Sequence, residues 1–412
     1  MNQNAFDLLK QRGFVAQVTD EPAVRDLLAR QQVTFYIGFD PTANSLHCGS
    51  LVPIMAMAQL QRTGHKPLGL IGGGTAMVGD PSGKTEMRQM LSFEAISANG
   101  DGIFGQLRRY LTLDGTLGLS ANNADWLLKL HYIEFLRDIG RYFRVNEMVR
   151  ADAYRARLER EEGLSFIEFN YQLLQAYDYL MLYERHGCLL QMGGDDQWSN
   201  ILAGTDLIRR KHGKQAFCIT FPLLTTARGE KMGKTAGGAV WLDAGRTSAY
   251  QFYQYWINTD DRDVRRFLAL FTFLPMDEVE RLGRAQGAAL NAAKEVLAFE
   301  ATRLCHGEAA ALEARSASRA AFGVGGDQSA IPSTIIVGAR LDAGIALIEL
   351  LVEAGLAPSK AEARRLVQQG GAYVNDLAIG DIAARIDSSA LKDGAILLRA
   401  GKKKVHRLVA ET

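Results

Sequence analysis

Residues 36–50 hold residue types that suit the binding of phosphate. A strand-like pattern passes there through a polar turn and enters a helix at His47-Cys48-Gly49. Backbone N–H groups at a helix N-terminus, with the helix dipole behind them, bind anions, and a nearby imidazole can donate to the same anion. A histidine beside a helix start can equally be a cap or a surface residue, so this segment alone leaves both interpretations open.

Two further segments carry lysines next to glycines. Residues 79–85 read Gly-Asp-Pro-Ser-Gly-Lys-Thr, but a P-loop needs four residues between its first glycine and Gly-Lys-Thr, and here there are three. The P-loop is therefore excluded, and a turn that carries Lys84 and Arg88 could either hold phosphates or be an ordinary solvated turn. Further along, Lys231 and Lys234 flank a glycine. Both ammonium groups could reach phosphates from such a loop, although exposed lysine pairs are common.

Two other segments offer polar groups for a small organic ligand. Tyr171, Gln175 and Asp178 follow the spacing i, i+4 and i+7, which places them on one face of a helix. Together they suit a small zwitterion with a hydroxyl at its far end, or they form the polar flank of an amphipathic helix. After the predicted strand at residues 188–192, Gly194 would let a ligand approach the backbone, and Asp196 could accept a hydrogen bond from a ribose hydroxyl.

The elements that must position these residues form an alternating pattern. Residues 33–39, 67–71 and 188–192 are apolar runs typical of buried strands, and each is followed by Gly, Asp or Pro. Residues 49–62 have the apolar stripe of a helix between the first two strands. Strand, helix and strand over this length predict a parallel sheet with helices on both faces, and ligands of such sheets bind at the carboxyl ends of the strands.

The second half of the chain has a different character. Residues 248–321 are mostly helical in pattern, and a glycine-rich stretch at 323–327 predicts a linker. From about residue 341 the pattern predicts two short helices followed by strands. From residue 356 onward there are ten Lys and Arg against six Asp and Glu, so a nearly neutral chain contains a basic C-terminal module.

Composition limits the class of protein. The chain has 412 residues, 47% of them hydrophobic, which predicts two to four globular domains. Lys and Arg number 47 and Asp and Glu 46, which argues against a protein that coats nucleic acid with its whole surface. Four cysteines without CxxC spacing argue against a zinc site or a disulfide framework. No signal peptide or membrane span is expected, and we predict a soluble intracellular protein.

Taken in order, the segments resemble the class I aminoacyl-tRNA synthetases, and most closely the bacterial tyrosyl-tRNA synthetase family. His47-Cys-Gly-Ser stands in place of the family's HIGH motif, and Lys231-Met-Gly-Lys-Thr stands in place of KMSKS. In the tail, residues 359–367 and 371–375 resemble an S4-type RNA-binding module. The remaining matches are Tyr36-x-Gly-Phe-Asp-Pro-Thr, Gly79-Asp-Pro-Ser-Gly, the Tyr171/Gln175/Asp178 stripe and Gly194-Asp-Asp-Gln-Trp.

The sequence departs from the two family motifs at one position each. Ser50 stands where HIGH has its last histidine, so no catalytic role is carried onto it. Gly233 stands where KMSKS has its first serine, and because Lys231 and Lys234 are both kept, the phosphate-binding role is carried onto them.

The resemblance implies a role for each candidate residue. Tyr36 and Asp178 would bind the phenol of tyrosine, Asp80, Tyr171 and Gln175 its ammonium group, and Gln197 would lie near its carboxylate. ATP and the adenylate would contact Gly38, Asp40, His47, Gly49, Gly194, Asp196 and Lys234. The catalytic set would be Thr42, His47, Lys84, Arg88, Lys231 and Lys234. RNA would contact Lys360, Arg364, Arg365, Lys402, Lys403 and Lys404.

The resemblance also implies an architecture and partners. The fold class is α/β, with a Rossmann-like parallel-sheet catalytic domain over residues 1–245 that includes a helical connective segment. An α-helical anticodon-binding domain over 246–325, a linker over 326–340 and a small α+β S4-like domain over 341–412 would follow. L-Tyrosine, ATP with Mg²⁺ and tRNA(Tyr) are the expected partners, with no dedicated protein metal site. A cytoplasmic homodimer is expected.

Three other functions were weighed against this one. A tryptophanyl synthetase shares the fold, but a hydroxyl-reading pair such as Tyr36 and Asp178 fits an indole poorly. A P-loop ATPase is disfavoured by the glycine spacing. A non-enzymatic RNA-binding protein derived from a synthetase would be expected to have lost the lysines or the tyrosine pocket, and the sequence keeps both.

Overall fold

The computed structural model divides the chain into two compact units, which are described separately. One unit comprises Met1–Thr247 with Asp260–Ala293, and the other comprises Ser248–Thr259 with Lys294–Thr412. The structure describes residues 3–82, 91–151, 154–155, 158–159, 163–227, 229, 231–235, 238–321, 331–401 and 404–411, with the backbone alone at 234–235.

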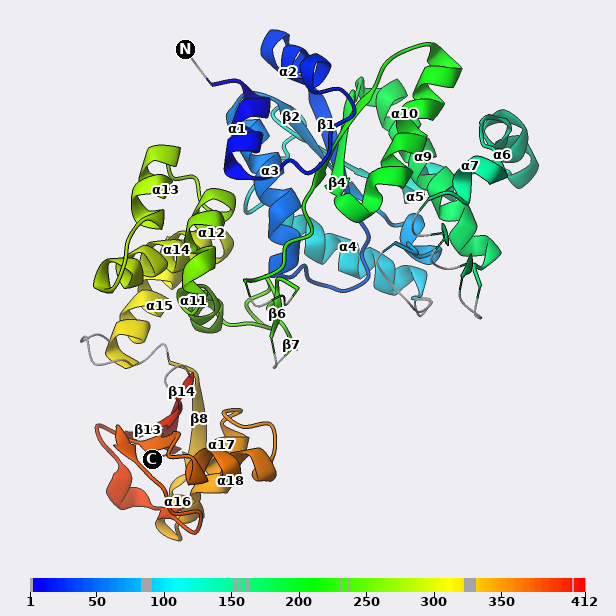
Figure 1. The fold of residues 1–412 in the computed structure, drawn as a ribbon. Helices are drawn as coiled ribbons and strands as arrows, with labels where there is room; N and C mark the ends of the chain where they lie inside the picture. Colours follow the sequence, from blue (N-terminus) through cyan, green and yellow to red (C-terminus); the bar gives the residue numbers. More distant parts are fainter. Residues whose placement is uncertain are drawn as a thin grey trace. The chain divides into compact units, whose positions relative to one another are not determined.

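A five-stranded parallel sheet forms the centre of the first unit (Figure 1). Its order is β3-β2-β1-β4-β5, and every neighbouring pair is parallel. The prediction of a parallel sheet is confirmed. The third predicted strand begins two residues later than expected, at Leu190, because the preceding helix ends at Gly187 in a left-handed conformation and residues 188–189 make the connection. The strands are β1 Thr34–Phe39, β2 Lys66–Ile71, β3 Leu119–Asn122, β4 Leu190–Gly194 and β5 Phe217–Phe221.

Two helices position most of the candidate site. Helix α3, Leu51–Arg62, is buried along most of its length and follows a 3-10 turn at Cys48–Ser50. Helix α9, Phe166–His186, begins with a capping box in which the Ser165 hydroxyl and the Glu168 carboxylate satisfy each other's backbone N–H groups. The other helices of this region are α1 Ala5–Arg12, α2 Glu21–Arg30, α4 Phe93–Leu107, α5 Ala124–Leu127, α6 Tyr132–Asp138, α7 Val145–Met148 and α10 Trp198–His212.

Helices α12, Val264–Phe271, and α13, Met276–Gly283, belong to the first unit. The buried guanidinium of Arg12 on α1 donates to the carbonyls of Ala269 and Thr272, at 2.8 and 3.0 Å. The expected domain boundary at residue 245 assigned α12 and α13 to the helical domain. These long-range hydrogen bonds and the packing of α12 on α1 and α3 place both helices with the sheet instead.

The second unit contains helices and a mixed sheet. The sheet has the order β11-β10-β13-β14-β8, with β8 parallel to β14 and the other pairs antiparallel. The helices are α11 Ala249–Ile257, α15 Glu308–Ala321, α16 Gly338–Asp342, α17 Leu347–Glu353, α18 Lys360–Gln368 and most of α14 Ala288–His306, whose residues 288–293 belong to the first unit. The strands are β8 Ser333–Val337, β9 Ile345–Ala346, β10 Ala372–Val374, β11 Leu377–Ala378, β12 Arg385–Ile386, β13 Ala395–Ala400 and β14 Lys404–Glu411.

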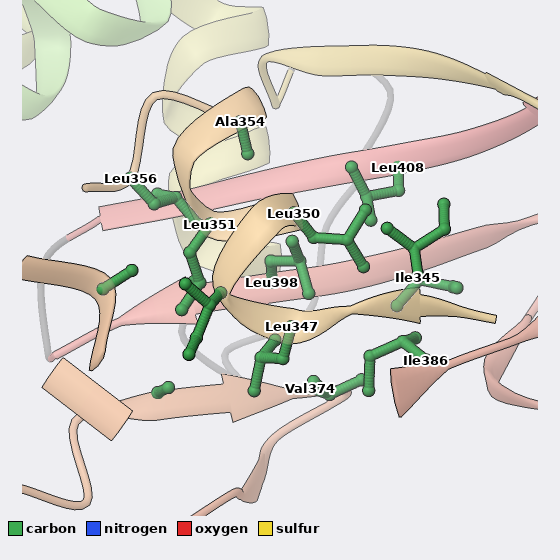
Figure 2. Close-up of a cluster of buried hydrophobic side chains, with 14 of the residues drawn as sticks. Ile345, Leu347, Leu350, Leu351, Ala354, Leu356, Val374, Ile386, Leu398 and Leu408 are labelled. Atoms are coloured by element: carbon green, nitrogen blue, oxygen red, sulfur yellow. The ribbon is translucent and has the colours of Figure 1, made fainter. Parts of the chain in front are cut away.

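The C-terminal sheet has a hydrophobic core of its own. Figure 2 shows Leu347, Leu350 and Leu351 of α17 packed with Leu398 and Leu408 of the sheet. Residues 333–340, which were predicted to be linker, form β8 and most of α16 in this unit. The glycine-rich stretch at 323–327 lies outside the described residues. Among the residues that the structure describes, no helix is both long enough and apolar enough to cross a membrane.

Candidate active site

A cavity of about 680 Å³ lies at and beyond the carboxyl ends of β1, β2, β4 and β5. Its lining includes most of the predicted site residues, which come from segments far apart in the chain. These residues are Tyr36, Gly38, Asp40, His47, Gly49, Asp80, Tyr171, Gln175, Asp178, Gly194, Asp196, Gln197 and Lys231. Parallel strands end at one edge of a sheet, which explains why their polar connections meet there.

The other predicted residues of this site are placed differently. Thr42 is exposed and does not line the cavity. Lys84 and Arg88 lie outside the described residues. The backbone of Lys234 pairs with Ala239 of β7, Gly238–Ala239, in a short hairpin with β6, Lys234–Thr235, but its side chain is not described.

One part of the cavity wall presents a phenol and a carboxylate that are both buried. The hydroxyl of Tyr36 is buried and has no hydrogen-bond partner among the described residues. Burial raises the pKa of Tyr36 well above its usual value, and the nearby carboxylate of Asp178 raises it further. The ring of Tyr36 meets that of Tyr179 edge to face, with centroids 5.3 Å apart. A ligand hydroxyl in the cavity would satisfy the unpaired phenol.

Two residues that the sequence analysis missed hold Asp178. Its two carboxylate oxygens accept hydrogen bonds from the indole N–H of Trp126, at 2.7 Å, and from the amide of Asn123, at 2.8 Å. Burial nevertheless raises the pKa of Asp178 to about 7, although these two donors act in the opposite direction. Asn123 and Trp126 follow β3, a strand too short to be recognised from its pattern, and this explains why no local signal marked them.

The same amide links Asp178 to Asp40 through a chain of hydrogen bonds. Asn123 donates to the hydroxyl of Thr75 at 2.9 Å, and Thr75 donates to Asp40 at 2.8 Å. The phenol of Tyr171 donates to the second oxygen of Asp40 at 2.9 Å. Burial, together with Asp40 and Asp80, raises the pKa of Tyr171 well above its usual value. Tyr171 is therefore a neutral donor that is held in a fixed orientation.

Another part of the cavity wall is formed by several polar side chains from α9, the end of β4 and the segment that carries Asp80. The amide of Gln197 donates to Asp80 at 2.8 Å, and the other oxygen of Asp80 accepts from the N–H of Ser82. The side-chain oxygen of Gln175 is buried and has no partner among the described residues. Burial and the charge of Asp80 raise the pKa of Asp196. This concentration of acceptors suits a cationic group of a ligand.

The HIGH-like and KMSKS-like segments touch each other. The N–H of Gly49 donates to Nδ1 of His47 at 3.0 Å. Gly233 lies against this turn with φ = 80°, and a Cβ added to Gly233 would lie 2.7 Å from the nitrogen of Gly49. Any residue with a side chain would be strained in that conformation and would collide with the turn. This contact gives a physical reason for glycine where the motif usually has serine.

The predicted RNA-binding residues lie in the second unit. Lys360, Arg364 and Arg365 are exposed on α18, whose buried residues are Ala363 and Val367. Arg365 pairs with Glu362 at 2.8 Å. Lys404 begins β14 and is exposed, whereas residues 402–403 lie outside the described part of the chain.

Metal-ligating side chains do not gather in the described part of the molecule. Within it, no group of three or more His, Cys, Asp or Glu residues is arranged to hold an ion. The four cysteines are buried, and none of them forms a disulfide bond in the described part of the chain.

Family comparisons agree with this geometry. Residues 28–323 match the family described as "tRNA synthetases class I (W and Y)", and residues 329–408 match a "Tyrosine--tRNA ligase SYY-like C-terminal domain". The chain is 56% identical to the tyrosine--tRNA ligase of Desulfosudis oleivorans, covering 98% of this chain and 99% of the relative. It is 53% identical to that of Caldanaerobacter subterraneus, covering 99% and 100%.

A solved structure supports the same assignment. The C-terminally truncated mitochondrial tyrosyl-tRNA synthetase of Aspergillus nidulans superimposes with a TM-score of 0.69 at 31% identity, covering 77% of this chain and 94% of that one. Relatives at more than half identity over their full length share the reaction as well as the fold. The chain therefore belongs to the tyrosyl-tRNA synthetase family of class I aminoacyl-tRNA synthetases, enzymes that activate L-tyrosine with ATP and transfer it to tRNA(Tyr).

Proposed function

We propose that the cavity is the adenylation site and that the phenol of tyrosine binds between Tyr36 and Asp178. The observation that carries this assignment is the buried Tyr36 hydroxyl, which lacks a hydrogen-bond partner among the described residues although it lines the cavity. An unpaired buried hydroxyl costs free energy, and the substrate hydroxyl would remove that cost. Asp178, oriented by Asn123 and Trp126, would accept the substrate's phenolic hydrogen.

The ammonium group of tyrosine would bind at the concentration of acceptors formed by Asp80, Gln175 and Tyr171. The unpartnered side-chain oxygen of Gln175 and the carboxylate of Asp80 favour a cation there. Tyr171 donates its hydrogen to Asp40, so its oxygen remains free to accept from the ammonium group. Gln197, hydrogen-bonded to Asp80, would lie near the substrate carboxylate.

ATP would occupy the part of the cavity lined by β1, the His47 turn and the end of β4. Gly38, Gly49 and Gly194 would let the nucleotide approach the backbone, Asp196 would accept a ribose hydroxyl, and Asp40 would flank the adenylate. Mg²⁺ would enter with ATP as part of the substrate, bound mainly by phosphate oxygens.

The chemistry needs no general base in its first step. The tyrosine carboxylate, already ionised at neutral pH, attacks the α-phosphorus of ATP, and the bond to pyrophosphate breaks. Catalysis would come from positioning and from donors placed where phosphate charge develops. The terminal ribose hydroxyl of tRNA then attacks the tyrosyl carbonyl and AMP leaves. The residues proposed to act on the phosphates are Thr42, His47, Lys84, Arg88, Lys231 and Lys234.

We assign tRNA binding to the C-terminal half of the chain. The helical segment within 246–325 would bind the anticodon region, and the S4-like segment within 341–412 would hold phosphates through Lys360, Arg364 and Arg365. These three cations are exposed, whereas Ala363 and Val367 of the same helix belong to the hydrophobic core.

We further propose that the protein is a cytoplasmic homodimer. Large apolar side chains are exposed on α6, α7 and the start of α9, which pack around one small core. Tyr132, Ile133, Val145 and Phe166 are 58%, 73%, 63% and 69% exposed. A cluster of this kind on a folded enzyme indicates a surface that is covered in the assembly.

Substrate analogues test the assignment of the two ends of tyrosine. Phenylalanine lacks the phenolic hydroxyl, and 3-(4-hydroxyphenyl)propionate lacks the ammonium group. We expect Tyr36→Phe to weaken discrimination against phenylalanine but not against the propionate. We expect Gln175→Ala to weaken discrimination against the propionate but not against phenylalanine. Competition in tyrosine-dependent exchange of pyrophosphate into ATP measures both. The reverse pattern would show that tyrosine binds in the opposite direction.

A further inference from the structure

Trp241 lies directly opposite His47 on a neighbouring segment of chain. The N–H of Cys48 donates to the carbonyl of Val240, and the N–H of Leu242 donates to the carbonyl of Leu46, both at 2.8 Å. In this antiparallel pattern, His47 and Trp241 form the pair without mutual hydrogen bonds, whose side chains lie closest together. Their rings meet edge to face, with centroids 6.2 Å apart and planes at 69°.

A cation also packs on the indole ring. The guanidinium carbon of Arg246 lies 3.3 Å from the centroid of Trp241. Arg246 also donates to the side chain of Asn44 at 3.0 Å, which ties it to the loop that leads to His47. The N–H of Trp241 donates to the hydroxyl of Thr247 at 3.0 Å, which closes the turn that brings Arg246 over the ring. The indole is thus in contact with both a guanidinium and an imidazole.

This arrangement defines the orientation of His47. Nδ1 of His47 accepts from Gly49 and carries no hydrogen in this bond, so the neutral ring has its hydrogen on Nε2. The ring is then a hydrogen-bond donor at the cavity, which His47 lines. Trp241 itself is not among the residues that line the cavity.

We propose that Trp241, supported by Arg246, is a positioning residue for His47 in adenylate formation. This inference rests on the proposed role of His47 at the phosphates. Trp241 limits rotation of the imidazole, so that the bond between Nδ1 and Gly49 is kept before ATP arrives. A preorganised donor loses less entropy when charge develops on the phosphate.

A double-mutant cycle tests the proposal. We expect Trp241→Leu to slow single-turnover adenylate formation about 2- to 13-fold, the range for loss of an aromatic pair, with tyrosine affinity unchanged. His47→Ala should slow the same step by about tenfold or more. On the His47→Ala background, Trp241→Leu should have less than about a twofold effect, because no imidazole remains to be positioned.

The possible outcomes separate the inference from the function on which it rests. Multiplicative effects of the two substitutions, or no effect of Trp241→Leu on the parent, would overturn the role of Trp241 alone. No effect of His47→Ala would instead reject the proposed role of His47, and the inference with it. Titration of active sites by adenylate burst amplitude reports folded enzyme, so a variant that is merely unstable loses amplitude rather than rate.

Two further variants provide a negative control and an alternative to Trp241→Leu. Phe273→Leu removes a ring that stacks under Arg62 at 4.5 Å and does not line the cavity, so adenylate formation should be unchanged. If Trp241→Leu fails to fold, Arg246→Met removes the exposed cation and keeps the indole. We expect it to slow adenylate formation about twofold on the parent and not at all on the His47→Ala background. Equal effects of Arg246→Met on both backgrounds would overturn the proposal.

Discussion

Replacement of Tyr36 by phenylalanine removes one oxygen atom from the cavity and leaves the aromatic ring in place. The ring keeps its edge-to-face contact with Tyr179, whose centroid is 5.3 Å away. Because the Tyr36 hydroxyl has no partner among the described residues, its loss breaks no hydrogen bond that the structure shows in the free enzyme. The free energy of unfolding should therefore stay constant or rise by up to about 1 kcal/mol, since a buried unpaired hydroxyl is unfavourable.

Tyrosine should bind more weakly to this variant, whereas phenylalanine should not. One neutral hydrogen bond contributes about 0.5–1.5 kcal/mol net, equivalent to about 2- to 13-fold. The ratio of kcat/KM for tyrosine over phenylalanine should narrow by that factor. The measurement is pyrophosphate exchange with each amino acid, together with urea unfolding of the free enzyme.

Tyr179→Phe is the matched control. The Tyr179 hydroxyl donates to the buried carbonyl of Phe217 at 2.8 Å and does not line the cavity. Its removal should cost about 1–3 kcal/mol of stability and leave the ratio between the two amino acids unchanged. An unchanged ratio in Tyr36→Phe, or a loss of stability as large as that of the control, would refute the assignment of Tyr36.

Four other predictions follow from the same geometry. Burial raises the pKa of Asp178 to about 7, and the ionised carboxylate is a stronger hydrogen-bond acceptor than the neutral acid. The value of kcat/KM for tyrosine should therefore rise with pH through about 7 in the parent, and this rise should be absent in Asp178→Asn. Burial lowers the pKa of His65, so below about pH 6.5 the unfolded chain binds more protons than the folded chain, and the free energy of unfolding should fall as the pH is lowered from 7 to 5.5. Urea unfolding should show that this fall is less steep in His65→Gln than in the parent. Lys234→Ala should slow adenylate formation and leave equilibrium tyrosine binding intact, whereas weaker tyrosine binding at a normal rate would contradict its phosphate role. Because β8 pairs with β14, the chain is best truncated before β8, after Ala321. The truncated protein should keep pyrophosphate exchange and lose most charging of tRNA. Undiminished charging would reject the RNA-binding assignment.

Local sequence determined the elements and the motifs. The apolar runs predicted β1 and β2, and the i, i+4, i+7 spacing predicted the face of α9 that carries Tyr171, Gln175 and Asp178. These predictions held because strand and helix periodicity depend on neighbours within a few residues. The meeting of β1, β4 and α9 residues at one cavity followed from a general property of parallel sheets.

Only the tertiary structure showed which residues contact and orient the side chains of the cavity, and where the boundary between the two compact units lies. Asn123 and Trp126 reach Asp178 across more than 50 residues, and Trp241 faces His47 across a much longer stretch of the chain. Arg12 of α1 donates to the carbonyl of Thr272 from 260 residues away, which joins the end of α12 to α1. Side-chain hydrogen bonds and ring contacts of this kind depend on distance in space, and a single sequence carries no periodic signal for them.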